Sequence, residues 1–172
     1  VIAFLLSRRP EKPGLRAMAF TLVGLGIWSF CYAMITVSPT LEEKHVWLKL
    51  ENIGIIIVPV LWFFFTMEFT RLDGWLTGKP IKWLFWIIPA ISLFIIFSER
   101  WFHLYYTSTR IAMESGGPLI ISRGPIYWVA LTQSYLLELI GVGVMVWRFI
   151  PSRLVYRKPM LSLIGAVTVP FF

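Results

Sequence analysis

Long apolar segments, separated by short basic or turn-forming connections, dominate this chain of 172 residues. Several of these segments approach the roughly 20 apolar residues that a helix needs to cross about 30 Å of hydrocarbon. Hydrophobic residues make up 58% of the chain and charged residues 15%, against about 25% charged residues in soluble proteins. A soluble domain of this length could not bury so much apolar surface, so the sequence predicts a polytopic membrane protein.

Six spans are predicted, and the fold class is an all-α integral membrane protein built as an antiparallel helix bundle. The spans cover residues 1–6, 15–37, 46–69, 81–98, 125–150 and 160–172. The first and sixth are incomplete, because the chain begins and ends within apolar sequence. We therefore expect the chain to be one transmembrane domain, residues 1–172, from a longer protein whose remaining parts lie outside it.

The basic residues predict the direction of each span. Eleven of the 16 Lys and Arg residues lie in or beside the first, third and fifth connections. Because positive residues favour the cytoplasmic side, these connections are predicted to be cytoplasmic and the N-terminus extracytoplasmic. The sixth span then heads outward, so a total of seven spans is expected. This topology accounts for the net charge of +7 without a nucleic-acid partner.

The connection between the fourth and fifth spans, residues 99–124, is longer than the others. Two β-prone stretches, residues 108–113 and 119–122, flank the sequence Gly116-Gly117-Pro118. This pattern predicts a short β-hairpin over the outer mouth of the bundle. Long ordered loops often carry function, so the hairpin is a candidate lid.

Glu138 is the most deeply placed charged residue. It lies about 18–20 Å beyond Pro125 at 1.5 Å per residue, where an ionised carboxylate costs several kcal/mol and should face the bundle interior. Helical spacing puts Ser134 on the same face. Two interpretations stay open: a ligand contact or proton-responsive switch, and a protonated carboxyl group that helps the helices to pack.

Glu51 lies near the outer end of the third span, next to Asn52. Trp62 follows on the same helical face beyond Pro59, where a kink is expected. A polar rim above an aromatic floor is typical of a pocket that opens to the outside. The alternative is an interfacial carboxylate paired with Lys49.

The second span supplies Trp28 and Tyr32. Trp28 lies deeper in the span than the membrane interface at which tryptophan is usually enriched, so it is a candidate for lining a cavity. The chain has two histidines, which make only a weak metal site. His103 is therefore kept as a candidate ligand contact rather than as a metal ligand. We therefore predict a ligand cavity between spans two, three and five, capped by residues 99–124. Its candidate contacts are Glu51, Asn52, Trp62, Glu138, Ser134, Trp28, Tyr32 and His103. Neither a cofactor nor an enzymatic activity is predicted for this chain.

Several short motifs follow one another in a specific order. They are Gly26-Ile-Trp28-Ser29 in span two, Trp47-x-Lys-x-Glu51-Asn-x-Gly54 and Pro59-Val-Leu-Trp62 in span three, Ile88-Pro89 in span four, and Arg123-Gly-Pro125-Ile-Tyr-Trp128 at the start of span five. Together they resemble the N-terminal seven-transmembrane sensor region of bacterial and archaeal histidine kinases. The same region also occurs ahead of PAS and diguanylate cyclase domains.

The resemblance implies a sensory input module in a prokaryotic cell membrane. Such a module detects an extracytoplasmic or membrane-borne ligand and relays the signal through a last helix to a cytoplasmic output domain of the same polypeptide. The expected partners are membrane lipids and a small-molecule or lipid-like ligand, and a homodimer is expected by resemblance alone. The alternative is a transporter or channel subunit, which would require a continuous polar path through the bundle.

Overall fold

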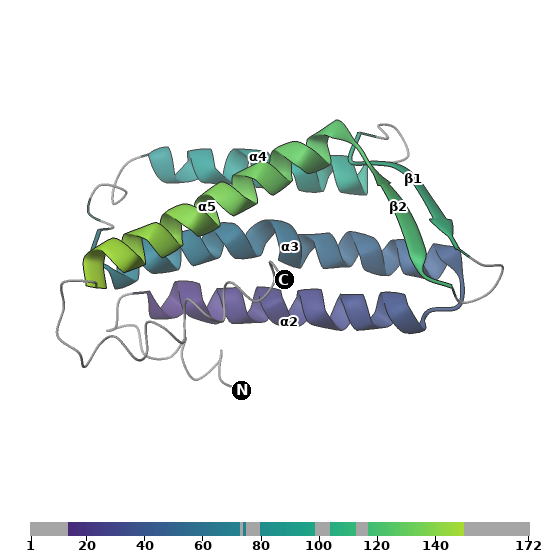
Figure 1. The fold of residues 1–172 in the computed structure, drawn as a ribbon, viewed down its shortest axis with the longest axis horizontal. Helices are drawn as coiled ribbons and strands as arrows, with labels where there is room; N and C mark the ends of the chain where they lie inside the picture. Colours follow the sequence, from purple (N-terminus) through teal and green to yellow (C-terminus); the bar gives the residue numbers. More distant parts are fainter. Residues whose placement is uncertain (1–13, 73, 75–79, 99–103, 113–116, 150–172) are drawn as a thin grey trace.

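The computed structural model describes residues 14–72, 74, 80–98, 104–112 and 117–149 of the chain. Within these residues the fold is mostly helical, with one small two-stranded sheet (Figure 1). The elements are α2 (Leu15–Val37), α3 (Leu41–Phe69), α4 (Ile81–Phe97), β1 (Tyr106–Ile111), β2 (Leu119–Arg123) and α5 (Pro125–Phe149). Among the described helices, α2, α3 and α5 are long and apolar enough to cross a membrane, and α4 is a shorter apolar helix.

The helical boundaries agree closely with the predicted spans, except at the start of α3. This helix begins at Leu41 rather than at residue 46, because Thr40 caps it. The Thr40 side chain accepts a hydrogen bond of 3.3 Å from the backbone N–H of Glu43, and Glu42 and Glu43 favour the positive end of the helix dipole. The predicted spans at residues 1–6 and 160–172 lie outside the described residues, so the totals of six and seven spans remain predictions.

The predicted hairpin is present, with different strand boundaries. β1 begins at Tyr106 rather than at residue 108 and ends at Ile111 rather than at residue 113, whereas β2 extends to Arg123. The strands are antiparallel and pair Tyr106 with Arg123, with an irregularity between Tyr106 and Ser108. The Tyr106 side chain is buried, so the strand begins where the chain can bury an aromatic ring rather than where β-propensity alone places it.

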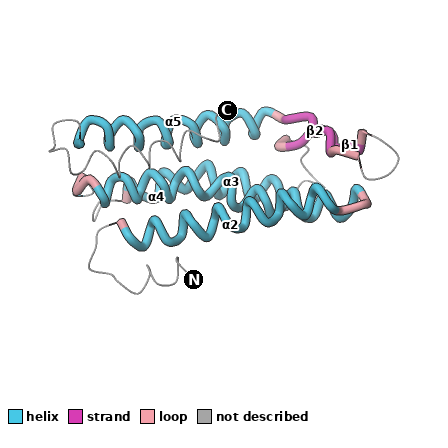
Figure 2. The backbone as a smooth tube through the Cα atoms, turned by 60° about the horizontal axis from the view of Figure 1, so that its bottom comes forward, coloured by secondary structure: helices cyan, strands magenta, loops and turns pink. Residues whose placement is uncertain are grey.

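The central helix of the bundle is α3, against which α2, α4 and α5 all pack (Figure 2). Aromatic rings join α3 to α4, with Phe63 and Phe85 centred 4.9 Å apart. The Gln133 side chain of α5 donates a hydrogen bond of 3.0 Å to the Phe85 carbonyl, which joins α5 to α4. The remaining bundle surface is strongly apolar, as expected for helices that face lipid.

The approach of α2 to α3 is unusually close at Gly54. A Cβ atom at this position would lie 2.7 Å from the Gly24 carbonyl oxygen and 2.9 Å from Cβ of Trp28. Small residues allow membrane helices to approach in this way. The contact sets the rotation of α2 against α3 and brings Trp28 beside the part of α3 that carries Glu51.

The hairpin lies at one end of the bundle and reaches from the start of α5 toward the connection between α2 and α3 (Figure 1). We call this the hairpin end; α2 ends there, and α3 and α5 begin there. The Gly124 N–H donates to the Tyr105 carbonyl over 2.8 Å and the Ile126 N–H donates to the Leu104 carbonyl over 3.2 Å. These bonds connect the base of the hairpin to the start of α5.

Candidate ligand-binding cavity

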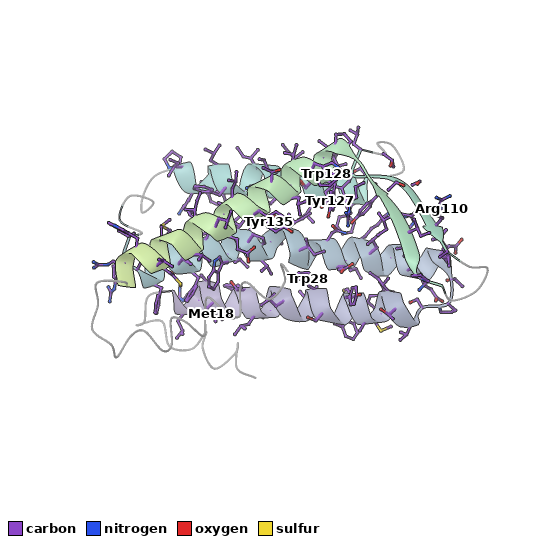
Figure 3. All side chains as sticks on the ribbon, in the orientation of Figure 1. Met18, Trp28, Arg110, Tyr127, Trp128 and Tyr135 are labelled. Atoms are coloured by element: carbon purple, nitrogen blue, oxygen red, sulfur yellow. The ribbon has the colours of Figure 1, made fainter. Side chains whose placement is uncertain are left out.

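A cavity of about 920 Å³ lies among α2, α3, α5 and the hairpin. Most of its wall is apolar, with side chains such as Leu25, Ile55 and Leu131 from the three helices. Figure 3 labels four of the lining residues, Met18 and Trp28 on α2 and Tyr127 and Tyr135 on α5. Ligand pockets commonly have volumes of about 300–1,000 Å³ and an apolar wall with a few placed polar groups, so this cavity has the character of a binding site.

The predicted candidate residues converge on this one cavity. Seven of them line it: Trp28 and Tyr32 from α2, Glu51, Asn52 and Trp62 from α3, and Ser134 and Glu138 from α5. The eighth, His103, lies outside the described residues. The geometry brings these side chains together, and their role in binding a ligand remains a prediction.

The middle of the cavity wall contains a hydrogen bond between two of these residues. The Trp28 Nε1–H group donates to Oε1 of Glu51 over 3.1 Å. Glu51 is buried, so its carboxyl group is removed from water and held by a partner on the neighbouring helix. The bond links α2 to α3 at the level of the cavity.

At the hairpin end, polar contacts join α3 to β1 beside the cavity. The Asn52 Nδ2 group donates hydrogen bonds to the Tyr106 hydroxyl over 2.7 Å and to the Leu48 carbonyl over 2.6 Å. Nε2 of His45 and the Thr109 hydroxyl are 3.0 Å apart, which provides a second polar contact between α3 and the hairpin. Tyr106 lines the cavity, so the hairpin forms part of its wall.

Tyr105 and Tyr106 form a buried aromatic pair at this end, with ring centroids 4.9 Å apart. Burial raises the pKa of both hydroxyl groups well above the ordinary value for tyrosine. The two groups are therefore neutral at physiological pH and keep their protons for hydrogen bonding.

Lys44 is a lining residue that was not among the predicted contacts. Its side chain is only 1% exposed, and its Nζ donates a hydrogen bond of 2.6 Å to the Ile35 carbonyl. In the sequence, Lys44 lies close to a predicted membrane boundary, where a basic residue ordinarily indicates topology. The spacing of seven residues to Glu51, which places both on one helical face, is the signal that could have found it.

Arg123 is a second cationic lining residue outside the predicted set. It lies at the end of β2, and its guanidinium group is centred 4.9 Å from the Tyr127 ring centroid. Lys44 and Arg123 come from different elements, one from the first turn of α3 and the other from the hairpin. The cavity is therefore lined by two cations as well as by the carboxyl groups of Glu51 and Glu138.

Further along the cavity, α5 approaches α3 at Gly141. A Cβ atom at Gly141 would lie 2.9 Å from Nε1 of Trp62. Trp62 is 6% exposed, and its Nε1–H group has no hydrogen-bond partner among the described residues. Glu138 is half-buried and lies one helical turn from Gly141, so an indole donor and a carboxyl group occupy neighbouring parts of the wall.

The described part of the chain contains no group of three or more His, Cys, Asp or Glu side chains that could hold a metal ion. Its cavity therefore offers hydrogen-bonding groups, two cations and apolar surface rather than a set of metal ligands. Such a lining can bind and orient a molecule.

Comparisons with known proteins identify the family. Residues 1–172 match the family model described as the N-terminal 7TM region of histidine kinase. Comparison with curated proteins returned no match, and comparison with solved structures returned none. The match extends over the whole chain and confirms the resemblance carried by the motifs of spans two to five. The chain therefore belongs to the family of N-terminal seven-transmembrane regions of histidine kinases, a membrane-spanning sensor region that is not itself catalytic.

Proposed function

We propose that this region detects a small-molecule or lipid-like ligand that binds in the cavity between α2, α3 and α5. The observation that carries the proposal is that one cavity of about 920 Å³ is lined by three candidate membrane spans and by the hairpin. A molecule bound there contacts all four elements at once. It can therefore bind one arrangement of these elements more tightly than another, which is the requirement for a signal.

The moving element in this proposal is α5. On the opposite wall, α2 and α3 are joined by the Trp28–Glu51 hydrogen bond and by the close contact at Gly54. The contact of α5 with α3 at Gly141 leaves the Trp62 Nε1–H group without a partner among the described residues. A ligand that fills the cavity shifts α5 relative to the α2–α3 pair, and the following helices relay this shift to a cytoplasmic output domain. The hairpin end is extracytoplasmic in this arrangement, as the basic residues predict, and the receptor acts as a homodimer in a prokaryotic cell membrane.

Filling the cavity with a side chain tests the proposal without knowledge of the ligand. In the full-length protein, Ser134→Trp places an indole in the cavity, whereas Thr132→Trp adds the same group to an exposed position on the same helix. A coupling free energy of about 1–3 kcal/mol between two sites corresponds to a change of about 5- to 150-fold. We expect the autophosphorylation rate of Ser134→Trp to change by at least about fivefold on this basis, and that of Thr132→Trp to remain at the wild-type rate.

Equal autophosphorylation rates in both variants and the wild type would contradict the proposal, provided that all three proteins elute alike in size-exclusion chromatography. The alternative function, transport, predicts a flux of ions or small solutes into liposomes that contain the protein. A flux that Ser134→Trp blocks and Thr132→Trp does not would favour a transporter or channel over a sensor.

A further inference from the structure

We propose that the ligand is an elongated amphiphile whose anionic head group binds between Lys44 and Arg123 at the hairpin end of the cavity. This inference rests on the proposed function, because it assumes that the cavity is the ligand site. The observations that carry it are the burial of Lys44, the presence of a second cation in the same lining, and the distribution of charge along the cavity.

Lys44 is a buried ammonium group that lacks a counterion among the described residues. One of its three N–H groups is used by the Ile35 carbonyl at 2.6 Å, and no described carboxylate pairs with it. Removing an ammonium group from water is costly, and buried charges in proteins are almost always paired. Because Lys44 lines the cavity, an anion in the cavity can supply the missing partner.

Arg123 and Tyr106 add further recognition groups from the hairpin. The Arg123 guanidinium is held over the Tyr127 ring and lines the same cavity, and Arg side chains bind carboxylate and phosphate groups with two parallel hydrogen bonds. The Tyr106 oxygen accepts a hydrogen bond from Asn52, so its own proton remains available to donate. Donors from α3 and from β1 and β2 thus line the part of the cavity where a head group would lie.

The order of charges along α3 orients the ligand. Glu51 lies seven residues beyond Lys44, or about 10 Å at 1.5 Å per residue, and Trp62 lies about 27 Å beyond Lys44. The carboxyl group of Glu138 lines the wall near Trp62. The cations attract an anionic group and the carboxyl groups of Glu51 and Glu138 offer it no positive charge, so the head group lies at the hairpin end. The apolar chain then extends along Ile55, Val58 and Leu131.

A carboxylate and a phosphate share the chemistry that Lys44 and Arg123 recognise. The source of the ligand can therefore be a free fatty acid or a single-chain phospholipid. Palmitate and hexadecyl phosphate represent these two sources as probes. Hexadecanol has the same chain without a charge, hexadecyltrimethylammonium has the same chain with a positive charge, and inorganic phosphate has the charge without the chain.

The test measures the binding of tritiated palmitate to the full-length protein in phosphatidylcholine nanodiscs, with the cavity-filled variant Ser134→Trp as the background for partition into lipid. Lys44→Met is expected to weaken palmitate binding by about ten- to a hundredfold, because it removes hydrogen bonds to a charged group. Hexadecanol should bind this variant as it binds the wild type. Lys82→Met is the matched control, since Lys82 is exposed on α4 and does not line the cavity.

Arg123→Gln keeps the inference testable if Lys44→Met does not fold. Arg123 is exposed, so this variant is expected to fold and to weaken palmitate binding by about two- to fivefold, consistent with a partly solvated charge. In the wild type, palmitate or hexadecyl phosphate should compete at least about tenfold better than hexadecanol. The stronger of the two anions identifies the carboxylate or phosphate source.

The inference is overturned if hexadecanol or hexadecyltrimethylammonium competes as well as the anionic probes, or if Lys44→Met binds palmitate like the wild type. Competition by inorganic phosphate as strong as that by hexadecyl phosphate would refute the requirement for a chain. If palmitate and hexadecanol bind equally well and Ser134→Trp abolishes the binding of both, the cavity is a ligand site, but the anionic head group is refuted. Absence of binding by every probe, together with wild-type autophosphorylation in Ser134→Trp, would refute both proposals.

Discussion

The Nε1–H group of Trp28 on α2 donates a hydrogen bond of 3.1 Å to the Glu51 carboxyl group on α3, and both residues line the same cavity. Glu51 is 7% exposed, so this hydrogen bond replaces water as a partner of its carboxyl group. The bond lies beside the close contact of α2 and α3 at Gly54, where the Trp28 Cβ faces the glycine. One pair of side chains therefore contributes both to helix packing and to the shape of the candidate site.

Removing the Trp28 donor should destabilise the bundle. Trp28→Phe keeps an aromatic ring and leaves the Glu51 carboxyl group without this bond, which is expected to cost about 1–3 kcal/mol of unfolding free energy. Glu51→Gln retains an acceptor oxygen and should cost less. Thermal unfolding in detergent measures both effects, with Trp83→Phe as the control because Trp83 is 67% exposed. A midpoint for Trp28→Phe equal to that of Trp83→Phe would refute the structural role of the bond.

The close contact between α2 and α3 predicts opposite outcomes for two glycine substitutions. Gly54→Ala would place Cβ 2.7 Å from the Gly24 carbonyl oxygen, so the helices must separate and the protein should lose about 1–3 kcal/mol of stability. Gly26→Ala adds the same methyl group where, among the described residues beyond the local turn of α2, no atom lies within 4 Å, and the higher helix propensity of Ala should leave stability unchanged or raised by up to about 1 kcal/mol. Unfolding midpoints that fall equally in both variants would argue against this packing.

The hydrogen bond between Asn52 and Tyr106 predicts how firmly the hairpin is held on α3. Tyr106→Phe removes the acceptor of the 2.7 Å bond and should cost about 0.5–1.5 kcal/mol, with faster hydrogen exchange at the backbone amides of β1. Ser108→Ala removes a bond between two exposed hydroxyl groups of the hairpin and should have a smaller effect, because water replaces that bond. Exchange rates in β1 that rise as much in Ser108→Ala as in Tyr106→Phe would contradict this prediction.

The buried tyrosines predict a loss of stability at alkaline pH. Burial raises the pKa of Tyr105 and Tyr106 above the value of about 10 expected in the unfolded chain. Their contribution to stability is therefore fully present below about pH 10, and it is lost as the pH rises further, because the unfolded chain releases these protons first. The double variant Tyr105→Phe/Tyr106→Phe should lose less stability than the wild type between about pH 8 and about pH 11. Thermal unfolding across this range checks the sign, and identical pH profiles would refute the prediction.

Much of the architecture could be predicted because it depends on local properties. The span at residues 15–37 matches α2, and Pro125 marks the start of α5, as a proline at the first helical turn often does. The start of α3 was predicted too late, because hydropathy does not register the polar first turn that Thr40 caps. The sequence placed the hairpin correctly, but it did not show that Tyr106 would be buried against Asn52.

The residues of the candidate site were likewise predicted only in part from the sequence. Glu51, Trp62 and Glu138 were predicted as cavity residues because polar or aromatic side chains within a membrane span are expected to face the bundle interior. Lys44 was not predicted, because a lysine near a membrane boundary ordinarily extends its charge toward water. In the structure its side chain is instead 1% exposed, and it donates to the Ile35 carbonyl of the preceding helix.

The sequence by itself determined the helices and the hairpin, because apolar length, capping residues and glycine-containing turns act over a few neighbouring residues and are written directly in the chain. Only the tertiary structure decided which polar groups meet. Asn52 and Tyr106 are 54 positions apart, and Trp28 and Glu51 are 23 positions apart. Such pairings depend on the rotation of each helix about its axis and on the distance between helices, and both are set by side-chain contacts such as that at Gly54.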